Sequence, residues 1–409
     1  MQVALFHPGT QHSRQTAFAL QQLGRLAFFA TGLFPPDEAH LRLLPGPLGS
    51  RLRERLRSFG DDRLDPALVH AWPRYELPER LLARLGAPGA AARFDRFAND
   101  RLGGRVAAMA AQRPDCALWG FDNSALGAFS DPQATGHVRI LDRTIADWRE
   151  WNRIAGSIAD THGDWLPAHV RMAPDWLIER SDAEYAAADV ILCPAPFVRE
   201  TILRHSGVEG LERRMVDLPY CFDARHFAPL PAIAVPPAAS PVRFLFVGQL
   251  SARKGLQHVL EAFDLLPEGS ASLTCIGPRV VPDAVLGRWR DRVDFRASMP
   301  RALLAAAMRE HDVLLLPSYF EGSAIVLLEA LASGLAVIAT RQAGLGPTAA
   351  SGITLERPDT QALAAAMERL AADRELLLSM RRHAPLDAAN YDENAYRARI
   401  AVMLGDLPA

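Results

Sequence analysis

The stretch that decides the fold is FLFVGQLSARKGLQHVLEAF, residues 244–263. An apolar run leads into a glycine-containing loop and then into residues with helical periodicity, which predicts strand, loop and helix in that order. Lys254, inside the loop, is the only lysine of the 409-residue chain. A compact ammonium group suits a tight loop better than a planar guanidinium. The loop is therefore either a phosphate-binding loop or an ordinary turn that holds a leftover lysine.

A phosphate at this loop would meet several donors at once. Gly248 ends the strand and lets the backbone approach a ligand, while Gly255 follows the lysine where a helix begins. Backbone N–H groups, a helix N-terminus and the Lys254 ammonium would then face the same anion.

A second informative stretch is LLLPSYFEGSAIVLLEALASGLAVIAT, residues 314–340. It predicts a buried strand ending at Pro317, a loop, a helix over about 323–333 with Gly334 as its stop, and another strand. Glu321 lies in the loop and Glu329 inside the helix, with its side chain leaning back toward the loop.

These two carboxylates flank a helix N-terminus, whose free N–H groups suit an anion. Carboxylates are also strong acceptors for sugar hydroxyls. Glu329 stands in an almost wholly apolar helix, where a lone carboxylate needs a partner. The alternative interpretation is a loop carboxylate beside a helix and a solvated helix residue.

The whole chain alternates short apolar runs with amphipathic segments, which predicts an α/β protein with parallel sheets. The proline-rich segment 228–241 cannot be a central strand or a helix, so we expect a linker there. It separates an N-terminal domain (1–227) from a C-terminal domain (242–386), and the helical segment 387–409 is expected to pack back on the first domain. The predicted strands are 3–6, 26–30, 117–119, 138–141 and 190–193, then 243–247, 272–276, 293–296, 313–316 and 335–339.

Composition excludes several function classes. Forty-five basic and 47 acidic residues give a net charge of -2, which argues against a nucleic-acid surface. Four cysteines without a Cys-x-x-Cys pair argue against a disulfide framework or zinc site. With neither a leader-like start nor a long apolar run, we expect a cytoplasmic protein. The Arg51–Phe59 region, with alternating arginines, is either a membrane-surface helix at the inner face or a solvated helix face.

These motifs together resemble the glycosyltransferases of family four, which have the two-domain GT-B fold: two Rossmann-like domains facing each other across a cleft. EGSAIVLLE meets the family's E-x(7)-E pattern from Glu321 to Glu329, and GQLSARKG resembles its phosphate loop. Segments 188–203 and 218–227 resemble the end of the family's first domain and its entry to the linker. The resemblance is specific over about residues 185–370.

The resemblance implies retaining transfer of a sugar from a UDP- or GDP-linked donor to a glycan, lipid-linked or small-molecule acceptor, as in polysaccharide biosynthesis. Lys254 would hold the diphosphate, Glu321 the sugar hydroxyls and Glu329 the ribose. No cofactor or metal is expected, because we find no Asp-x-Asp pair in a loop and no His-x-x-x-His spacing. The remaining donor-binding candidates are Gly248, Gln249, Arg253, Gly277, and the amides of Gly322, Ser323 and Ala324.

The chain departs from the family at several points. Gln249 replaces the phosphate-loop arginine, a loss that Arg253 could offset. The histidine usual after the fourth strand of the first domain is absent, and Asp142 is the nearest polar candidate for a catalytic role. His12, in the loop after the first strand, is a candidate for acceptor or donor contact or a helix-capping residue. Asp122 could also reach the cleft.

Three functions therefore stay open. The first is a retaining glycosyltransferase. The second is a nucleotide-sugar epimerase or phosphorylase on the same scaffold, and the third is an inactive nucleotide-sugar-binding module.

Overall fold

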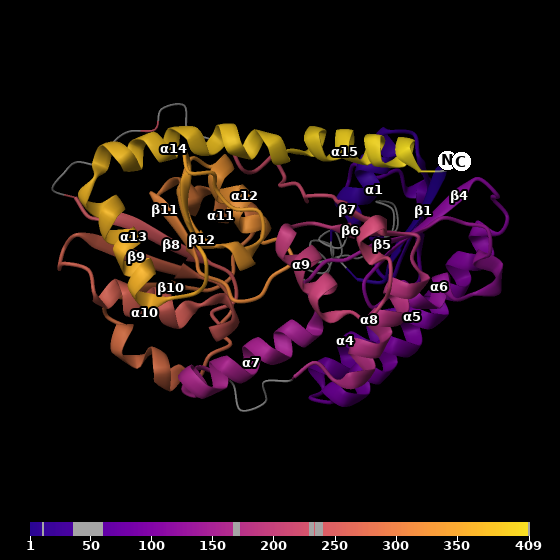
Figure 1. Ribbon diagram of the computed structural model, residues 1–409, viewed down its shortest axis with the longest axis horizontal. Helices are drawn as coiled ribbons and strands as arrows, with labels where there is room; N and C mark the ends of the chain where they lie inside the picture. The colour runs from indigo at the N-terminus through magenta and orange to yellow at the C-terminus, as the bar shows by residue number, and fades with distance from the viewer. Residues whose placement is uncertain (10–11, 36–59, 167–171, 229–232, 234–239, 408–409) are drawn as a thin grey trace, which may run out of the picture.

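Two parallel β-sheets, each covered by helices on both faces, form the core of the protein in a computed structural model (Figure 1). The structure describes residues 1–9, 12–35, 60–166, 172–228, 233 and 240–407. The expected Arg51–Phe59 membrane contact and most of the expected linker at 228–241 lie outside these described residues.

The N-terminal sheet has seven strands in the order β3-β2-β1-β4-β5-β6-β7. All pairs are parallel, so every connection crosses over through a helix or loop on a sheet face. The strands are β1 (Gln2–His7), β2 (Leu26–Thr31), β3 (Val69–Ala71), β4 (Cys116–Phe121), β5 (Arg139–Asp142), β6 (Val190–Cys193) and β7 (Met215–Asp217).

The C-terminal sheet has six parallel strands in the order β10-β9-β8-β11-β12-β13. Its members are β8 (Val242–Val247), β9 (Ala271–Ile276), β10 (Val293–Arg296), β11 (Val313–Leu316), β12 (Ala336–Thr340) and β13 (Gly352–Leu355).

Helices cover both sheets. Those of the N-terminal domain are α1 (Ser13–Gln22), α4 (Leu77–Arg84), α5 (Pro88–Ala110), α6 (Leu126–Phe129), α7 (Trp148–His162), α8 (Asp175–Ala187) and α9 (Pro196–His205). Those that follow are α10 (Leu256–Asp264), α11 (Arg301–Arg309), α12 (Ile325–Ala332), α13 (Thr360–Ala372), α14 (Arg374–Ala388) and α15 (Glu393–Asp406). None of these described helices has the length and apolar character needed to cross a bilayer.

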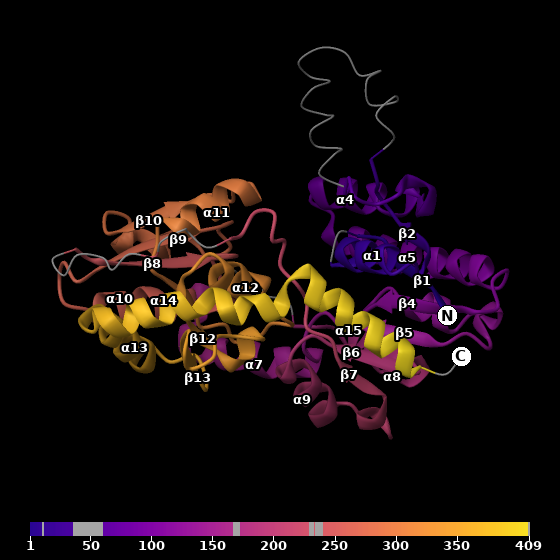
Figure 2. The ribbon, with the colours of Figure 1, turned by 90° about the horizontal axis from the view of Figure 1, so that it is seen from above.

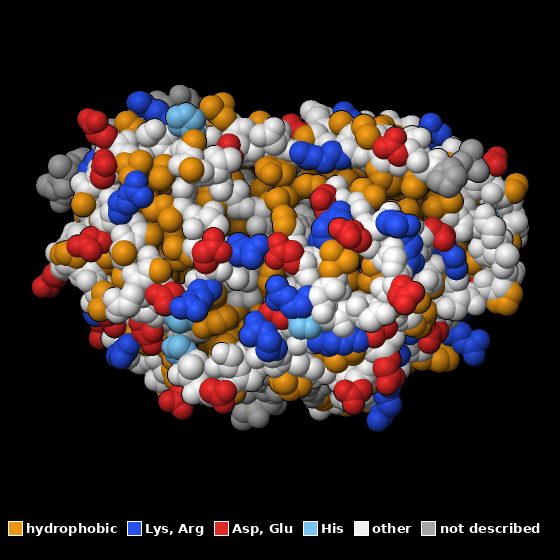
Figure 3. Space-filling model, in the orientation of Figure 1, with side chains coloured by type: hydrophobic (Ala, Val, Ile, Leu, Met, Phe, Trp, Pro, Cys, Tyr) orange, Lys and Arg blue, Asp and Glu red, His pale blue; other side chains and the backbone are white. Residues whose placement is uncertain are grey.

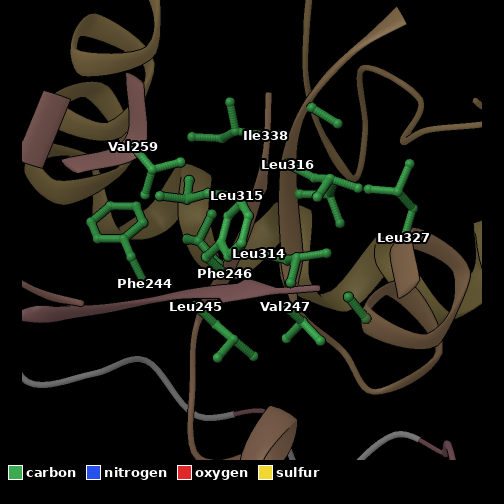
Figure 4. Packing of buried hydrophobic residues seen from close by; sticks show 14 of the residues in the cluster. Phe244, Leu245, Phe246, Val247, Val259, Leu314, Leu315, Leu316, Leu327 and Ile338 are labelled. Atoms are coloured by element: carbon green, nitrogen blue, oxygen red, sulfur yellow. The ribbon is translucent and has the colours of Figure 1, made fainter. Parts of the chain in front are cut away.

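The core of the C-terminal domain explains why its strands read as unbroken apolar runs. Side chains of β8 and β11 point to both faces of the sheet and meet α10 and α12 there (Figure 4). Strands buried on both faces have no polar side to alternate with. The helix α12 is apolar for the same reason, since it packs between this sheet and α14.

The chain ends by returning to the first domain. Helix α14 packs beside α12, and α15 continues across to α1, so both termini lie on the N-terminal domain (Figures 1 and 2). The hydroxyls of Tyr396 and Thr16 lie 2.9 Å apart at this contact. The last helix buries three of its side chains in the N-terminal core: Tyr396, Ile400 and Met403. The end of the chain is therefore packed on the first domain.

On the face shown in Figure 3, acidic and basic side chains are intermixed over both domains. The described residues there form no extended surface of one sign, in keeping with the near-zero net charge of the sequence.

Candidate functional site

Each sheet has one topological switch point, a pair of neighbouring strands from which the chain connections run toward opposite edges of the sheet. In the C-terminal sheet it lies between β8 and β11, and in the N-terminal sheet between β1 and β4. Ligands of open parallel sheets bind in the crevice beyond the carboxyl ends of such strands. The loops that follow β8 and β11 carry Lys254 and Glu321, so the two motifs found in the sequence meet at one switch point.

The loop after β8 presents Lys254 across the end of the strand. Residues Ala252–Lys254 form a single 3-10 turn, and Gly255 then adopts a left-handed φ of 75° before α10 begins. The Lys254 side chain folds back over Gly248, where a Cβ would come within 2.9 Å of its Cδ. Glycine is needed at 248 to let the ammonium reach the site.

Two further glycines close this loop against its neighbours. A Cβ on Gly277 would lie 1.8 Å from the carbonyl oxygen of Gly248, and one on Gly255 would lie 2.0 Å from that of Pro317. Gly277 therefore supports the loop through backbone contact.

Glu321 is the centre of the ion-pair cluster. Its Oε1 lies 2.7 Å from the Lys254 Nζ and 3.0 Å from the Arg253 guanidinium, and Ser318 Oγ donates to it at 3.3 Å. Burial opposes ionisation of this carboxyl, but the two cations outweigh burial and hold the pKa of Glu321 below its usual value. Glu321 is therefore an anion with 9% of its surface exposed.

Arg253 contributes to this cluster, whereas Gln249 does not. The Arg253 guanidinium also donates to the Phe320 carbonyl at 2.6 Å, and its own carbonyl accepts from the Tyr319 amide at 2.9 Å. The Gln249 side chain is exposed. The structure thus places a second cation beside Lys254 at position 253, where the sequence suggested a replacement for the missing arginine.

The loop after β11 also makes the contact between the two domains. A Cβ on Gly322 would lie only 1.7 Å from the carbonyl oxygen of Thr144, in the loop after β5. Beside it, the Phe320 ring lies 5.6–6.3 Å, centroid to centroid, from Trp148, Trp151 and Phe197 of the first domain. No local sequence pattern predicts this aromatic contact, because its members lie far apart along the chain.

The amides at the start of α12 are only partly available to a ligand. The Ala324 amide donates to the Ala343 carbonyl at 2.9 Å, so the expectation that it faces a phosphate is wrong in this conformation. The amides of Gly322 and Ser323 donate no hydrogen bond within the described residues. Those two amides belong to the loop that precedes the N-cap residue Ala324, and they remain as donors for a ligand.

Glu329, 4% exposed, has the partner that its apolar surroundings demanded. That partner is Arg301, at the N-terminus of α11, which forms a short ion pair with its carboxylate. Burial raises the pKa of Glu329, and Arg301 lowers it only in part. Sequence reasoning missed Arg301, and a ribose at Glu329 would have to share this carboxylate with it.

His12 and Asp142 belong to one network in the first domain. His12 stacks on Tyr220 with ring centroids 4.0 Å apart, and burial, with Arg301 nearby, lowers its pKa to about 4. The Tyr220 hydroxyl donates to Asp142 at 2.6 Å, and the Trp119 indole donates at 3.2 Å. Burial raises the pKa of Asp142 to about 7.

This network changes the role expected of Asp142. Its side chain is 1% exposed and its two oxygens are occupied by Tyr220 and Trp119. The expectation that Asp142 contacts the substrate directly is therefore wrong for this conformation. Asp142 positions Tyr220, which supports the neutral His12 ring.

One group of possible metal ligands occurs among the described residues: His162, His258 and Glu261, whose ligand atoms lie within 4.8 Å of one another. Both ring nitrogens of His258 are already engaged, at 2.7 Å to Thr360 and 2.6 Å to Tyr319. A metal ion would have to break one of these bonds. Metal independence of the reaction stays a prediction.

The part of the chain that carries this site is similar to known glycosyltransferases. Residues 241–373 match the family model described as Glycosyl transferases group 1. This part of the chain is therefore similar to the glycosyltransferase group 1 domains. The D-inositol 3-phosphate glycosyltransferase of Corynebacterium jeikeium is 32% identical over 181 residues, which cover 40% of this chain and 43% of that protein. The chain thus spans less than half the length of this curated relative.

Solved structures show the fold over the whole chain. Sucrose-phosphate synthase from Thermosynechococcus elongatus superposes with a TM-score of 0.65 at 16% identity, over 99% of this chain and 98% of that one. Anabaena HepE in complex with UDP gives a TM-score of 0.64 at 14% identity over the full length of both chains. The predicted GT-B fold, with two Rossmann-like parallel-sheet domains, is confirmed.

Proposed function

We propose that the protein is a retaining, metal-independent glycosyltransferase that uses a nucleotide-sugar donor. The observation that carries the proposal is the convergence of Lys254 and Arg253 on Glu321 at the C-terminal switch point. The group 1 domain match and the glycosyltransferase relatives support it. They favour neither the epimerase or phosphorylase nor the inactive binding module considered from the sequence.

The donor binds at this switch point with its diphosphate on Lys254, Arg253 and the amides of Gly322 and Ser323. Glu321 accepts hydrogen bonds from the sugar, and Glu329 from the ribose. The complex of HepE with UDP makes a UDP-linked sugar the first donor to test. Cytoplasmic location and membrane contact stay predictions.

The chemistry requires charge stabilisation more than proton transfer. As the bond between sugar and phosphate breaks, negative charge grows on the leaving diphosphate and positive charge on the sugar. Preorganised cations and amides stabilise the first, and the nearby Glu321 carboxylate stabilises the second. His12 is uncharged at neutral pH, because its pKa is about 4, so it cannot supply a proton.

A thermal-shift screen against nucleotide sugars tests this proposal. UDP-glucose, UDP-N-acetylglucosamine, GDP-mannose and ADP-glucose are compared, each with its free nucleoside as control. A ligand that binds only the native state raises the melting temperature. We expect one donor to stabilise the protein more than its nucleoside does. If none of the four nucleotide sugars stabilised the protein more than its nucleoside, the proposal would be contradicted.

A further inference from the structure

A cavity of about 250 Å³ lies at the switch point of the N-terminal sheet, opposite the donor site. The loops after β1 and β4 form one side of it, and α4 and α5 form the other. By the same rule that places the donor site in the C-terminal domain, this is where we expect the N-terminal domain to bind a ligand.

One residue, Thr144, lies between the cavity and the proposed donor site. Asp122 lines the cavity, and its carboxylate accepts from the amide and hydroxyl of Thr144 at 3.0 and 2.5 Å. The carbonyl of the same Thr144 packs against Gly322, which follows Glu321. Thr144 therefore contacts both the lining of the cavity and the loop that carries Glu321.

The lining of the cavity holds an excess of negative charge. Four carboxylates and one arginine contribute to it. Glu76 forms an ion pair with Arg80, and Asp122 lies 3.6 Å from the buried Arg143. For Glu79 and Asp95, no cationic side chain among the described residues comes within 4.0 Å. Burial, together with the Glu79 charge, raises the pKa of Asp95, although Arg180 and Asn99 partly offset this.

A buried amide adds an acceptor without a donor. Asn99 is 4% exposed, and its Nδ2 donates to Asp95 Oδ2 at 3.2 Å. Its Oδ1 has no hydrogen-bond partner among the described residues, and the same holds for Oδ1 of Asn123 on the opposite wall. Asn123 also has a left-handed φ of 65°. Strained and unsatisfied groups of this kind are concentrated at ligand sites.

We propose that this cavity is the acceptor subsite and that it binds the ammonium group of an amino sugar, held by Asp95, Glu79 and Asn99 Oδ1. An ammonium group brings three donors, no acceptor and a positive charge. These match two carboxylates without a paired cation and the Asn99 Oδ1, which has no donor among the described residues. A neutral hydroxyl leaves the charge uncompensated, and a phosphate is repelled. The assignment as acceptor subsite rests on the proposed glycosyltransferase function.

Calorimetric binding to the full chain in the presence of UDP tests the inference. The probes are D-glucosamine and its neutral counterparts D-glucose and N-acetyl-D-glucosamine, at about pH 6.5 so that the amine is protonated. We expect glucosamine to bind at least about tenfold more tightly than glucose. Equal affinities for the three sugars would overturn the inference.

Matched variants locate the effect. Asp95→Asn and Glu79→Gln should each abolish the preference for glucosamine, while Glu179→Gln, which removes an exposed charge from α8 outside the cavity, should retain it. Using two cavity variants guards against misfolding of one. A preference that survives in both would overturn the assignment to this cavity.

Donor binding, measured separately with UDP-glucose, distinguishes this inference from the proposed function. A protein that binds UDP-glucose without any amine preference contradicts the inference alone. If the protein prefers glucosamine but binds no nucleotide sugar, the cavity is a cation site. That result would contradict both its role as acceptor subsite and the proposed function.

Discussion

The ammonium of Lys254 lies 2.7 Å from the Oε1 of Glu321, so the lone lysine of the chain and the first acidic residue of its E-x(7)-E motif form an ion pair. The two residues come from loops that follow different strands, 67 positions apart (321 − 254). The ammonium of Lys254 and the carboxylate of Glu321 neutralise each other's charge, and both side chains are largely buried. A diphosphate that binds Lys254 must therefore compete with Glu321, which is free to turn to the sugar.

This competition predicts opposite effects on binding and transfer for Glu321→Gln. The variant keeps the side-chain volume but releases Lys254 and Arg253, so UDP should bind as tightly as to wild type or more tightly. Transfer should fall by about 10²–10³, the cost typical of losing one group that stabilises transition-state charge. Release of UDP from UDP-glucose and calorimetry of UDP binding measure the two effects.

The control for this variant is Glu356→Gln, at an exposed position of the same domain. It should resemble wild type in both assays. Wild-type turnover in Glu321→Gln would show that Glu321 is not part of the site.

Gly322→Ala should separate the two domains where they touch. The added Cβ would lie 1.7 Å from the Thr144 carbonyl oxygen, so backbone on one side must move. We expect a larger radius of gyration by small-angle X-ray scattering and loss of transfer, with native secondary structure retained. Gly287→Ala, where a Cβ meets nothing within 4 Å, is the control. Unchanged scattering and activity in Gly322→Ala would argue against this contact.

Asp142→Asn should change how stability depends on pH. Burial raises the pKa of Asp142 from 3.8 to about 7, so the folded protein holds a proton that the unfolded chain releases. The stability due to this proton is fully present below about pH 4 and is lost as pH rises to about 7, with a slope of at most about 1.4 kcal/mol per pH unit. The asparagine variant lacks this dependence.

Urea unfolding of both proteins at acid and at mildly alkaline pH measures the difference. Relative to wild type, the variant should be less stable at about pH 4 than at about pH 8. A stability difference that does not vary with pH would mean that Asp142 is ionised in the fold.

The sequence predicted the central strands well because they are buried on both faces. Val190–Cys193 and Val313–Leu316 match their predicted ranges to the residue, and so does one edge strand, Val293–Arg296. The strands that it missed, β3, β7 and β13, all lie at sheet edges. They are three or four residues long and carry polar side chains, so they have no continuous apolar run to reveal them.

The site shows the same division. Glu321, Glu329 and Lys254 stand in local motifs, so spacing alone predicted them. Three features of the site depend on how distant segments pack. They are the ion pair of Arg301 with Glu329, the contact of Thr144 with Gly322, and the burial of Asp142. No local pattern records such contacts, which is why Asp142 was expected to meet substrate.

The most direct test of the central claim is calorimetry of UDP and uridine binding to wild type and to Lys254→Ala. A charge-assisted contact to phosphate contributes about 1.5–3 kcal/mol, so UDP affinity should fall at least about tenfold while uridine affinity stays unchanged. Arg290→Ala, which removes an exposed cation from the same domain, should alter neither. An equal loss for both ligands, or no loss for UDP, would contradict the claim that Lys254 holds the diphosphate.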